Sequence, residues 1–214
     1  MAQIGIYGGA FDPIHFGHLQ PALEVLQALH LDEIWFLPTY QTVHKDQPQV
    51  SAAQRCEMVQ RAIAPIEAFK LSRLEVDRGG ASYMVDSLML LRQKWPNHQW
   101  VLIMGRDAFE NFTQWHRYEE ILQLANLVVT QRPEIQAKAQ AIFSNEAVQK
   151  LLVNRQVSQF SQPAGQIKLQ AVTQLAISST QIRQKIQQNQ PLDFLMPQKV
   201  IDYIQQNKLY LSVK

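Results

Sequence analysis

Short apolar runs alternate along the chain with segments whose apolar residues recur every three or four positions. The first pattern is typical of buried strands and the second of helices that pack on one face. We predict strands at residues 4–7, 33–37, 100–104, 127–130 and 167–172, with a third strand or an edge hairpin at 69–76. We predict helices at residues 17–29, 51–63, 82–94, 118–124, 178–188 and 197–207.

This order of strand then helix predicts an α/β fold, a Rossmann-like doubly wound parallel sheet with helices on both faces. The 214 residues fit one domain, with an α/β core over about 1–172 and a small C-terminal helical part over about 173–214. Residues 39–50 are interpreted as a loop, 77–81 as a glycine-bearing turn and 134–166 as helical connections. Sheets of this kind bind ligands beyond the carboxyl ends of their strands.

Composition narrows the function classes. The formal net charge of +2 is too balanced for a protein that coats nucleic acid. One cysteine excludes an intrachain disulfide and a Cys-cluster metal site, and Cys56 is interpreted as a small half-buried residue. No apolar run reaches the roughly 18–20 residues that cross a membrane, and the chain starts without a signal-type segment. We therefore expect a cytoplasmic protein with no membrane partner.

The first strand runs directly into the sequence GGAFDPIHFGH, which begins at Gly8. Gly8 and Gly9 permit unusual φ values and a close approach of the backbone to a ligand. His15 and His18 share one face if a helix begins there, and a helix N-terminus with two imidazoles suits phosphate, which favours protonated histidine. A zinc site with Asp12 as third ligand and a pair of capping or surface histidines remain as alternatives.

A second candidate phosphate site begins with the sequence ISSTQIR at residues 177–183. Three hydroxyls at a helix start and an arginine one turn later can hold a polyphosphate. Alone, this pattern is explained better by simple capping with a solvated arginine.

Together the two motifs resemble those of the nucleotidylyltransferase superfamily and, more narrowly, of bacterial nicotinate-nucleotide adenylyltransferases. The resemblance covers most of the chain and is weakest at residues 134–166. It includes the sequences GRD at 105–107, WHRY at 115–118 and RP at 132–133, and the ending from Leu195 to Tyr210.

The resemblance implies that ATP is joined to nicotinate mononucleotide, with in-line attack on the α-phosphorus and no covalent intermediate. The catalytic residues it implies are His15, His18 and Arg183. The ATP-binding residues it implies are Gly8, Gly9, Phe11, Gly105, Asp107, Ser178, Ser179 and Thr180. Mg²⁺ would bridge phosphate oxygens with few protein ligands, so we expect no metal site of the protein's own.

For the mononucleotide, the resemblance implies contacts from His44, Lys45, Ser82, Tyr83, Trp115, Tyr118 and Arg132. Trp115 would stack on the pyridine ring, whereas core packing is the ordinary role of a lone tryptophan. The family usually carries threonine where this chain has Met84, which leaves the choice between the nicotinate and nicotinamide substrates open.

Two other interpretations stay open. The same chemistry serves other acceptors, such as nicotinamide mononucleotide, phosphopantetheine or another phosphate monoester, although a pantetheine arm has no need of Trp115. A nucleotide-binding sensor without turnover is the alternative outside enzymes. The expected partners are ATP and a pyridine mononucleotide, and the sequence leaves a homo-oligomer open.

Overall fold

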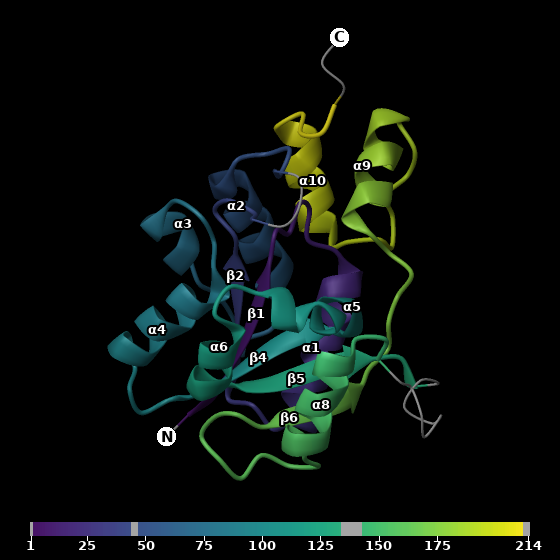
Figure 1. Cartoon of the computed structure of the whole chain (residues 1–214). Helices are drawn as coiled ribbons and strands as arrows, with labels where there is room; N and C mark the ends of the chain where they lie inside the picture. Colours follow the sequence, from purple (N-terminus) through teal and green to yellow (C-terminus); the bar gives the residue numbers. More distant parts are fainter. Residues whose placement is uncertain (1, 44–46, 134–142, 212–214) are drawn as a thin grey trace.

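The computed structural model describes residues 2–43, 47–133 and 143–211. Within these residues one parallel sheet has the strand order β3-β2-β1-β4-β5-β6 (Figure 1). Its strands are β1 (Gln3–Gly9), β2 (Glu33–Pro38), β3 (Phe69–Leu71), β4 (Gln99–Gly105), β5 (Asn126–Gln131) and β6 (Ile167–Ala171). The order reverses between β1 and β4, and at such a point doubly wound sheets bind ligands in a crevice outside the carboxyl ends of the strands. The predicted fold class is confirmed.

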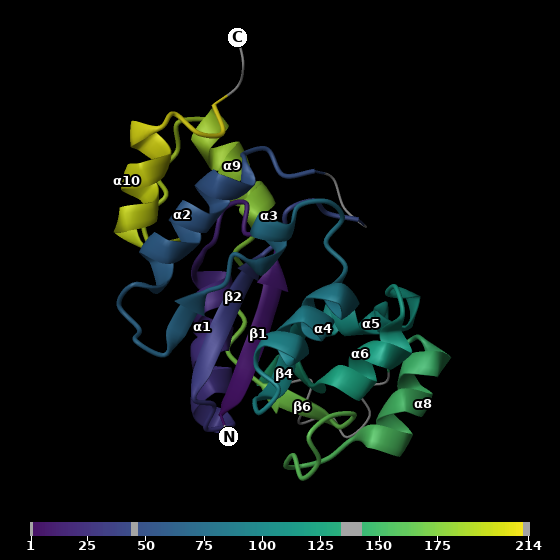
Figure 2. The same ribbon diagram turned by 90° about the vertical axis from the view of Figure 1, so that its left-hand side faces the viewer.

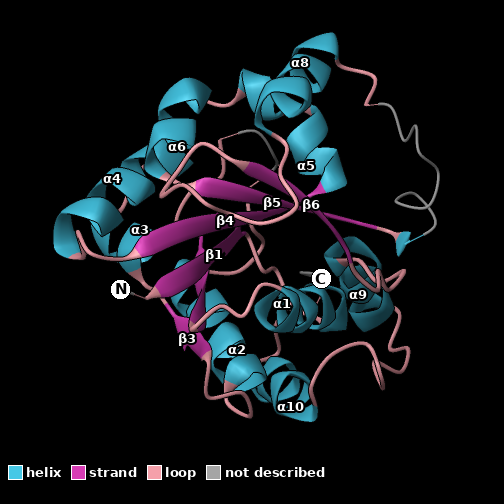
Figure 3. Cartoon of the chain, turned by 90° about the horizontal axis from the view of Figure 1, so that it is seen from below, coloured by secondary structure: helices cyan, strands magenta, loops and turns pink. Residues whose placement is uncertain are grey.

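Helices cover both faces of this sheet (Figure 3). The helices on one face are α1 (Phe16–Ala28), α2 (Ala52–Ile63), α9 (Ser179–Gln187) and α10 (Gln198–Gln206). Those on the other are α4 (Met84–Lys94), α5 (Arg106–Glu110), α6 (Tyr118–Leu124) and α8 (Glu146–Arg155). A short helix, α3 (Leu74–Arg78), and a 3₁₀ turn, η1 (Phe112–Gln114), complete the described elements.

Strand β4 shows why the two layers form. Val101 and Ile103 are buried among residues of α1, α2, α9 and α10, whereas Trp100, Leu102 and Met104 are buried among those of the opposite layer. Successive side chains of a strand point to opposite faces, so a continuous apolar run such as this one supplies two cores at once.

The C-terminal helices share the first of these cores. Ile182 of α9 and Val200 of α10 are fully buried in the same cluster as Val25 of α1. Figure 2 shows α2, α9 and α10 gathered at the end of the sheet toward which β1 runs. The second phosphate motif is therefore carried to the same end of the molecule as the first.

Three local predictions need correction. The segment 69–76 contributes only the short strand β3, and α3 follows it before the left-handed Gly79 (φ 71°). Ser82 does not cap α4, because Tyr83 is the N-cap and the Ser82 Oγ accepts a hydrogen bond from the Tyr40 N–H at 2.9 Å. Cys56 is fully buried rather than half-buried.

The helix starting at Ser51 matches its prediction closely. The Ser51 Oγ accepts from the Gln54 N–H at 3.3 Å, and the Gln54 side chain accepts from the Ser51 N–H at 3.0 Å. This reciprocal capping box satisfies two donors that the helix itself leaves without partners. No helix in the described part of the chain is long and apolar enough to cross a membrane.

Candidate active site

The two phosphate motifs lie in direct contact. The Ser179 Oγ donates to the Pro13 carbonyl at 2.9 Å, and the Arg183 Nη1 donates to the Asp12 carbonyl at 2.7 Å. These bonds join residues more than 160 positions apart in the chain. The first turn of α9 is thus fixed against the turn that leads from β1 into α1.

His15 and His18 form one imidazole pair at the start of α1. His15 is the N-cap residue, and the two ring centroids are 3.8 Å apart. The His15 backbone N–H donates to the His18 Nδ1 at 3.3 Å. Because the His18 Nδ1 accepts, the neutral His18 ring carries its proton on Nε2, where it can act as a donor.

Burial sets the protonation of His15. The residue is 4% exposed, and burial lowers its pKa to about 4. Its Nδ1 has no hydrogen-bond partner among the described residues. The protonated form that we expected on phosphate contact is therefore not the form of the ligand-free protein at neutral pH, where burial disfavours the charge.

Gly17 makes room for this pair. A Cβ at Gly17 would lie 2.9 Å from the His15 ring and 3.2 Å from the Ile177 carbonyl oxygen. Gly17 is part of the sequence motif, but the sequence alone predicts no role for it. Its absent side chain lets α1 pack against the segment that precedes α9.

The backbone conformation of the two glycines at the end of β1 differs from the one we predicted. Gly8 and Gly9 lie inside the strand, and the left-handed residue of the turn is Phe11 (φ 49°). The Phe11 ring is buried against His18 at 5.3 Å between centroids, so its side chain supports the imidazole. Phe11 is 2% exposed, so its ring belongs to the core beneath the turn.

The hydroxyls of the second motif have defined partners in the free protein. The Ser178 Oγ caps α9 by accepting from the Gln181 N–H at 3.2 Å. The Thr180 Oγ1 accepts from the Arg183 Nη2 at 3.2 Å. Capping and phosphate binding are compatible here, because the N-terminus of a helix has more N–H donors than one serine can satisfy.

The carboxyl end of β4 lies beside that of β1. Gly105 is the N-cap of α5, and Asp107 is exposed in the first turn of that helix. Beside them, the Arg106 guanidinium lies 3.9 Å from the centroid of the Phe143 ring. An exposed carboxylate next to the crevice is suited to accept hydrogen bonds from a ribose.

Two of the residues predicted to hold the mononucleotide, Ser82 and Tyr83, lie at the start of α4. The Tyr83 ring packs on His116 with centroids 4.5 Å apart, which brings the WHRY sequence to this helix. Met84 reaches the end of β1, since its Cε lies 2.7 Å from where a Cβ on Gly8 would be. The start of α4 therefore borders the glycine end of the ATP turn.

The other residues predicted to hold the mononucleotide do not lie at the start of α4. Trp115 is half-buried, with its ring 5.7 Å from that of Phe112, and Tyr118 packs on the same phenylalanine. Tyr118 also lines an open pocket of about 520 Å³ against α8. Arg132 is exposed directly after β5. His44 and Lys45 lie outside the described residues.

Sequence reasoning missed a buried arginine beside the turn. Arg55 of α2 is 1% exposed and donates to the Ala10 carbonyl at 2.7 Å and to the Tyr40 carbonyl at 3.3 Å. The available signal was its position on the apolar stripe of α2 with Met58 and Val59. A charged residue on a buried stripe implies a fixed partner.

The described residues include no group of three His, Cys, Asp or Glu side chains suited to a metal ion. The Asp12 carboxylate, which the zinc alternative required, instead accepts from the Tyr210 hydroxyl at 2.7 Å and the Gln49 N–H at 2.9 Å. This donor set does not fit a zinc ion held by Asp12, His15 and His18.

Comparison with known proteins identifies the class. The cytidylyltransferase-like family model matches residues 6–185, so the chain belongs to that family. Within it, the chain is 49% identical over 207 residues to a probable nicotinate-nucleotide adenylyltransferase of Hydrogenovibrio crunogenus, covering 97% of each chain. A protein of the same description from Methylococcus capsulatus is 40% identical, with 97% of this chain and 99% of that one covered. The resemblance inferred from the two motifs is confirmed.

A solved structure has the same fold. The chain matches the Plasmodium falciparum nicotinic acid mononucleotide adenylyltransferase complexed with NaAD with a TM-score of 0.71. The two are 20% identical over 98% of each chain, so this likeness supports the fold.

Proposed function

We propose that the protein transfers the adenylyl group of ATP to nicotinate mononucleotide, giving nicotinate adenine dinucleotide and pyrophosphate in NAD biosynthesis. The observation that carries the proposal is the hydrogen bond from Arg183 to the Asp12 carbonyl. It joins two motifs, each weak alone, into one phosphate site at the point where the strand order reverses. Relatives 49% and 40% identical carry the name of this activity.

The reaction forms one P–O bond and breaks another. A phosphate oxygen of the mononucleotide attacks the α-phosphorus of ATP, and the bond to the bridging oxygen of pyrophosphate breaks. Negative charge then grows on the α-phosphoryl oxygens and the leaving group, so catalysis needs positioning and hydrogen-bond donors. His18 supplies its Nε2–H, and Arg183 supplies a guanidinium at the start of α9.

His15 acquires its charge when the nucleotide binds. In the free protein burial holds its pKa at about 4. The negative charge of bound phosphates raises the pKa of a nearby imidazole, so His15 can take up a proton beside the transferring group. The two imidazoles thus act as a pair next to the backbone of Gly8 and Gly9.

The β- and γ-phosphates are assigned to Ser178, Ser179 and Thr180 with the N–H groups of α9. A Mg²⁺ ion would arrive bound to ATP, with few protein ligands of its own. That ion would neutralise phosphate charge. Asp107 is assigned to the ATP ribose beside Gly105.

The acceptor is assigned to the start of α4. Tyr83 and the N–H groups of that helix favour an anionic substituent, which selects the nicotinate carboxylate over the amide. Trp115 and Tyr118 frame the pyridine ring, and Ser82 fixes the backbone at Tyr40. His44, Lys45 and Arg132 are assigned to the mononucleotide phosphate. A cytoplasmic location stays a prediction from the sequence, which leaves a homo-oligomer open.

The test follows pyrophosphate release by the purified protein with ATP, Mg²⁺ and either nicotinate or nicotinamide mononucleotide. We expect turnover with the nicotinate form and a lower kcat/KM for the amide. Absence of turnover with both would overturn the proposal. ATP binding without any turnover would instead support the sensor alternative.

A further inference from the structure

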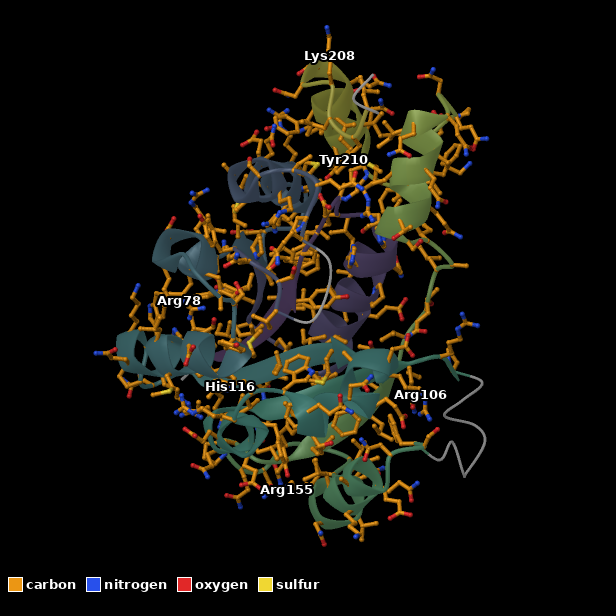
Figure 4. The ribbon with its side chains drawn as sticks, turned by 45° about the horizontal axis from the view of Figure 1, so that its top comes forward. Arg78, Arg106, His116, Arg155, Lys208 and Tyr210 are labelled. Atoms are coloured by element: carbon orange, nitrogen blue, oxygen red, sulfur yellow. The ribbon has the colours of Figure 1, made fainter. Side chains whose placement is uncertain are left out.

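Tyr210, near the end of the chain, reaches the N-terminal turn. Its hydroxyl donates to the Asp12 Oδ1 at 2.7 Å, and both residues are 5% exposed. Figure 4 places Tyr210 between α2, α9 and α10. No phosphate motif includes Tyr210, and packing alone would be served by a phenylalanine.

Asp12 is also the residue that holds Arg183. Its carbonyl accepts from the Arg183 Nη1 at 2.7 Å, and its Oδ2 lies 3.8 Å from the same nitrogen. The Oδ2 further accepts from the Gln49 N–H at 2.9 Å. Since both carboxylate oxygens are bonded to groups fixed in the core or backbone, the Asp12 side chain has a single defined orientation.

The electrostatics agree with a donor role for Tyr210. Burial and the Asp12 carboxylate raise the pKa of the Tyr210 phenol above its usual range, so the hydroxyl keeps its proton. The positive charge of Arg55 also acts on Asp12. Without the Tyr210 hydroxyl, the Asp12 Oδ1 would lose its donor in a buried place, and the Asp12 side chain beside Arg183 would no longer have a single orientation.

We propose that Tyr210 is a positioning residue for adenylyl transfer, because by holding Asp12 it fixes Arg183 for the phosphates. This inference rests on the proposed function of Arg183. An arginine has many rotamers, and holding it in place before the reaction removes an entropic cost from the catalytic step. The effect therefore falls on kcat more than on the KM for the mononucleotide.

The first measurement compares Tyr210→Phe with the wild type. The substitution keeps the ring and removes only the hydroxyl, and we expect kcat to fall by about tenfold, the worth of one buried hydrogen bond to a charged group. Tyr203→Phe on α10 is the matched control. It removes a hydroxyl from a ring packed under the Arg61 guanidinium and should leave kcat unchanged.

A double-mutant cycle with Arg183→Lys separates positioning from general structural support. If Tyr210 acts through Arg183, then Tyr210→Phe should change kcat by less than about twofold in the Arg183→Lys background. A tenfold fall in both backgrounds, or an unchanged kcat in Tyr210→Phe alone, would overturn the inference. If Tyr210→Phe does not fold, Asp12→Asn takes its place in the same cycle.

Failure of the proposed function has a different signature. In that case the wild type itself releases no pyrophosphate. The cycle is then measured by calorimetry as ATP affinity, where the loss caused by Tyr210→Phe should disappear in the Arg183→Lys background. Equal losses of affinity in both backgrounds, or none, would contradict the positioning role whatever the reaction.

Discussion

The burial of His15 predicts an acid-sensitive fold. Its pKa falls from the ordinary value of 6.5 to about 4 in the folded protein, because burial disfavours the charged ring. Between these values the unfolded chain binds a proton that the folded chain does not. The free energy of unfolding therefore keeps this contribution in full above pH 6.5 and loses it as the pH falls toward 4.

The size of the effect follows from the shift. One pKa unit corresponds to about 1.4 kcal/mol, so the full loss is about 3 kcal/mol, of which about 2 kcal/mol is reached at pH 5. His15 is 4% exposed, so solvent screening reduces this figure little. It is a substantial part of the roughly 5–15 kcal/mol by which a native domain is stable.

The assay is urea unfolding of the wild type and His15→Asn between pH 7.5 and pH 5. Asparagine is a good N-cap residue, so α1 keeps its start while the titrating group is lost. Carboxylates titrate in both proteins and cancel in the comparison. His30→Asn, at an exposed residue with φ 52°, is the matched control.

We expect the wild type to lose about 2 kcal/mol more than His15→Asn over this range, and His30→Asn to follow the wild type. Parallel losses in the wild type and His15→Asn would refute the buried neutral imidazole. So would a wild type that gains stability relative to the variant as the pH falls.

Three further outcomes test the site. His18→Ala should lower kcat by ~10²–10³ with a smaller change in the KM for ATP, and a wild-type rate would remove His18 from the mechanism. Trp115→Ala should raise the KM for the mononucleotide, and a rise confined to ATP would reverse the assignment of the two substrates. Gly17→Ala should lower the melting temperature through an overpacking cost of about 1–3 kcal/mol. Gly105→Ala, where a Cβ meets no atom within 4 Å, should be thermally close to the wild type, and equal Tm values for all three proteins would contradict the steric argument.

Periodicity was sufficient for the main elements because their patterns are long. The helical spacing of α1 extends over 13 residues, and the short apolar run at 100–104 ends at Gly105, which favours a strand over a helix. In the segment 69–76, apolar residues alternate only over 69–71 and again over 74–76, and such short alternations suit a strand and a helix equally well. Glu75 is buried in this segment, and its carboxylate accepts a hydrogen bond from the Ser87 Oγ at 2.7 Å. It lies in α3, a helix that no local pattern of the sequence predicts.

Contacts between distant segments could not be predicted in the same way. Ser82 has the chemistry of a helix cap, yet its oxygen bonds the Tyr40 N–H, 42 positions away. Tyr210 lies 198 positions from Asp12, and a tyrosine before the chain end has no local signature. The motifs indicated which groups meet phosphate, whereas the residues that hold those groups depend on tertiary packing.

Burial keeps the His15 ring neutral in the ligand-free protein, and the charged groups around the turn are already engaged with other partners. Arg55 and Arg183 both donate to backbone carbonyls of this turn. The Asp12 carboxylate accepts from the Tyr210 hydroxyl and the Gln49 N–H. A further cation on the buried His15 would find no additional counter-charge there until a polyphosphate arrives. Charging the ring only with the nucleotide bound makes its attraction strongest as negative charge grows on the transferring phosphoryl group. An interaction that is stronger in the transition state than in the bound ground state accelerates a reaction rather than merely tightening binding.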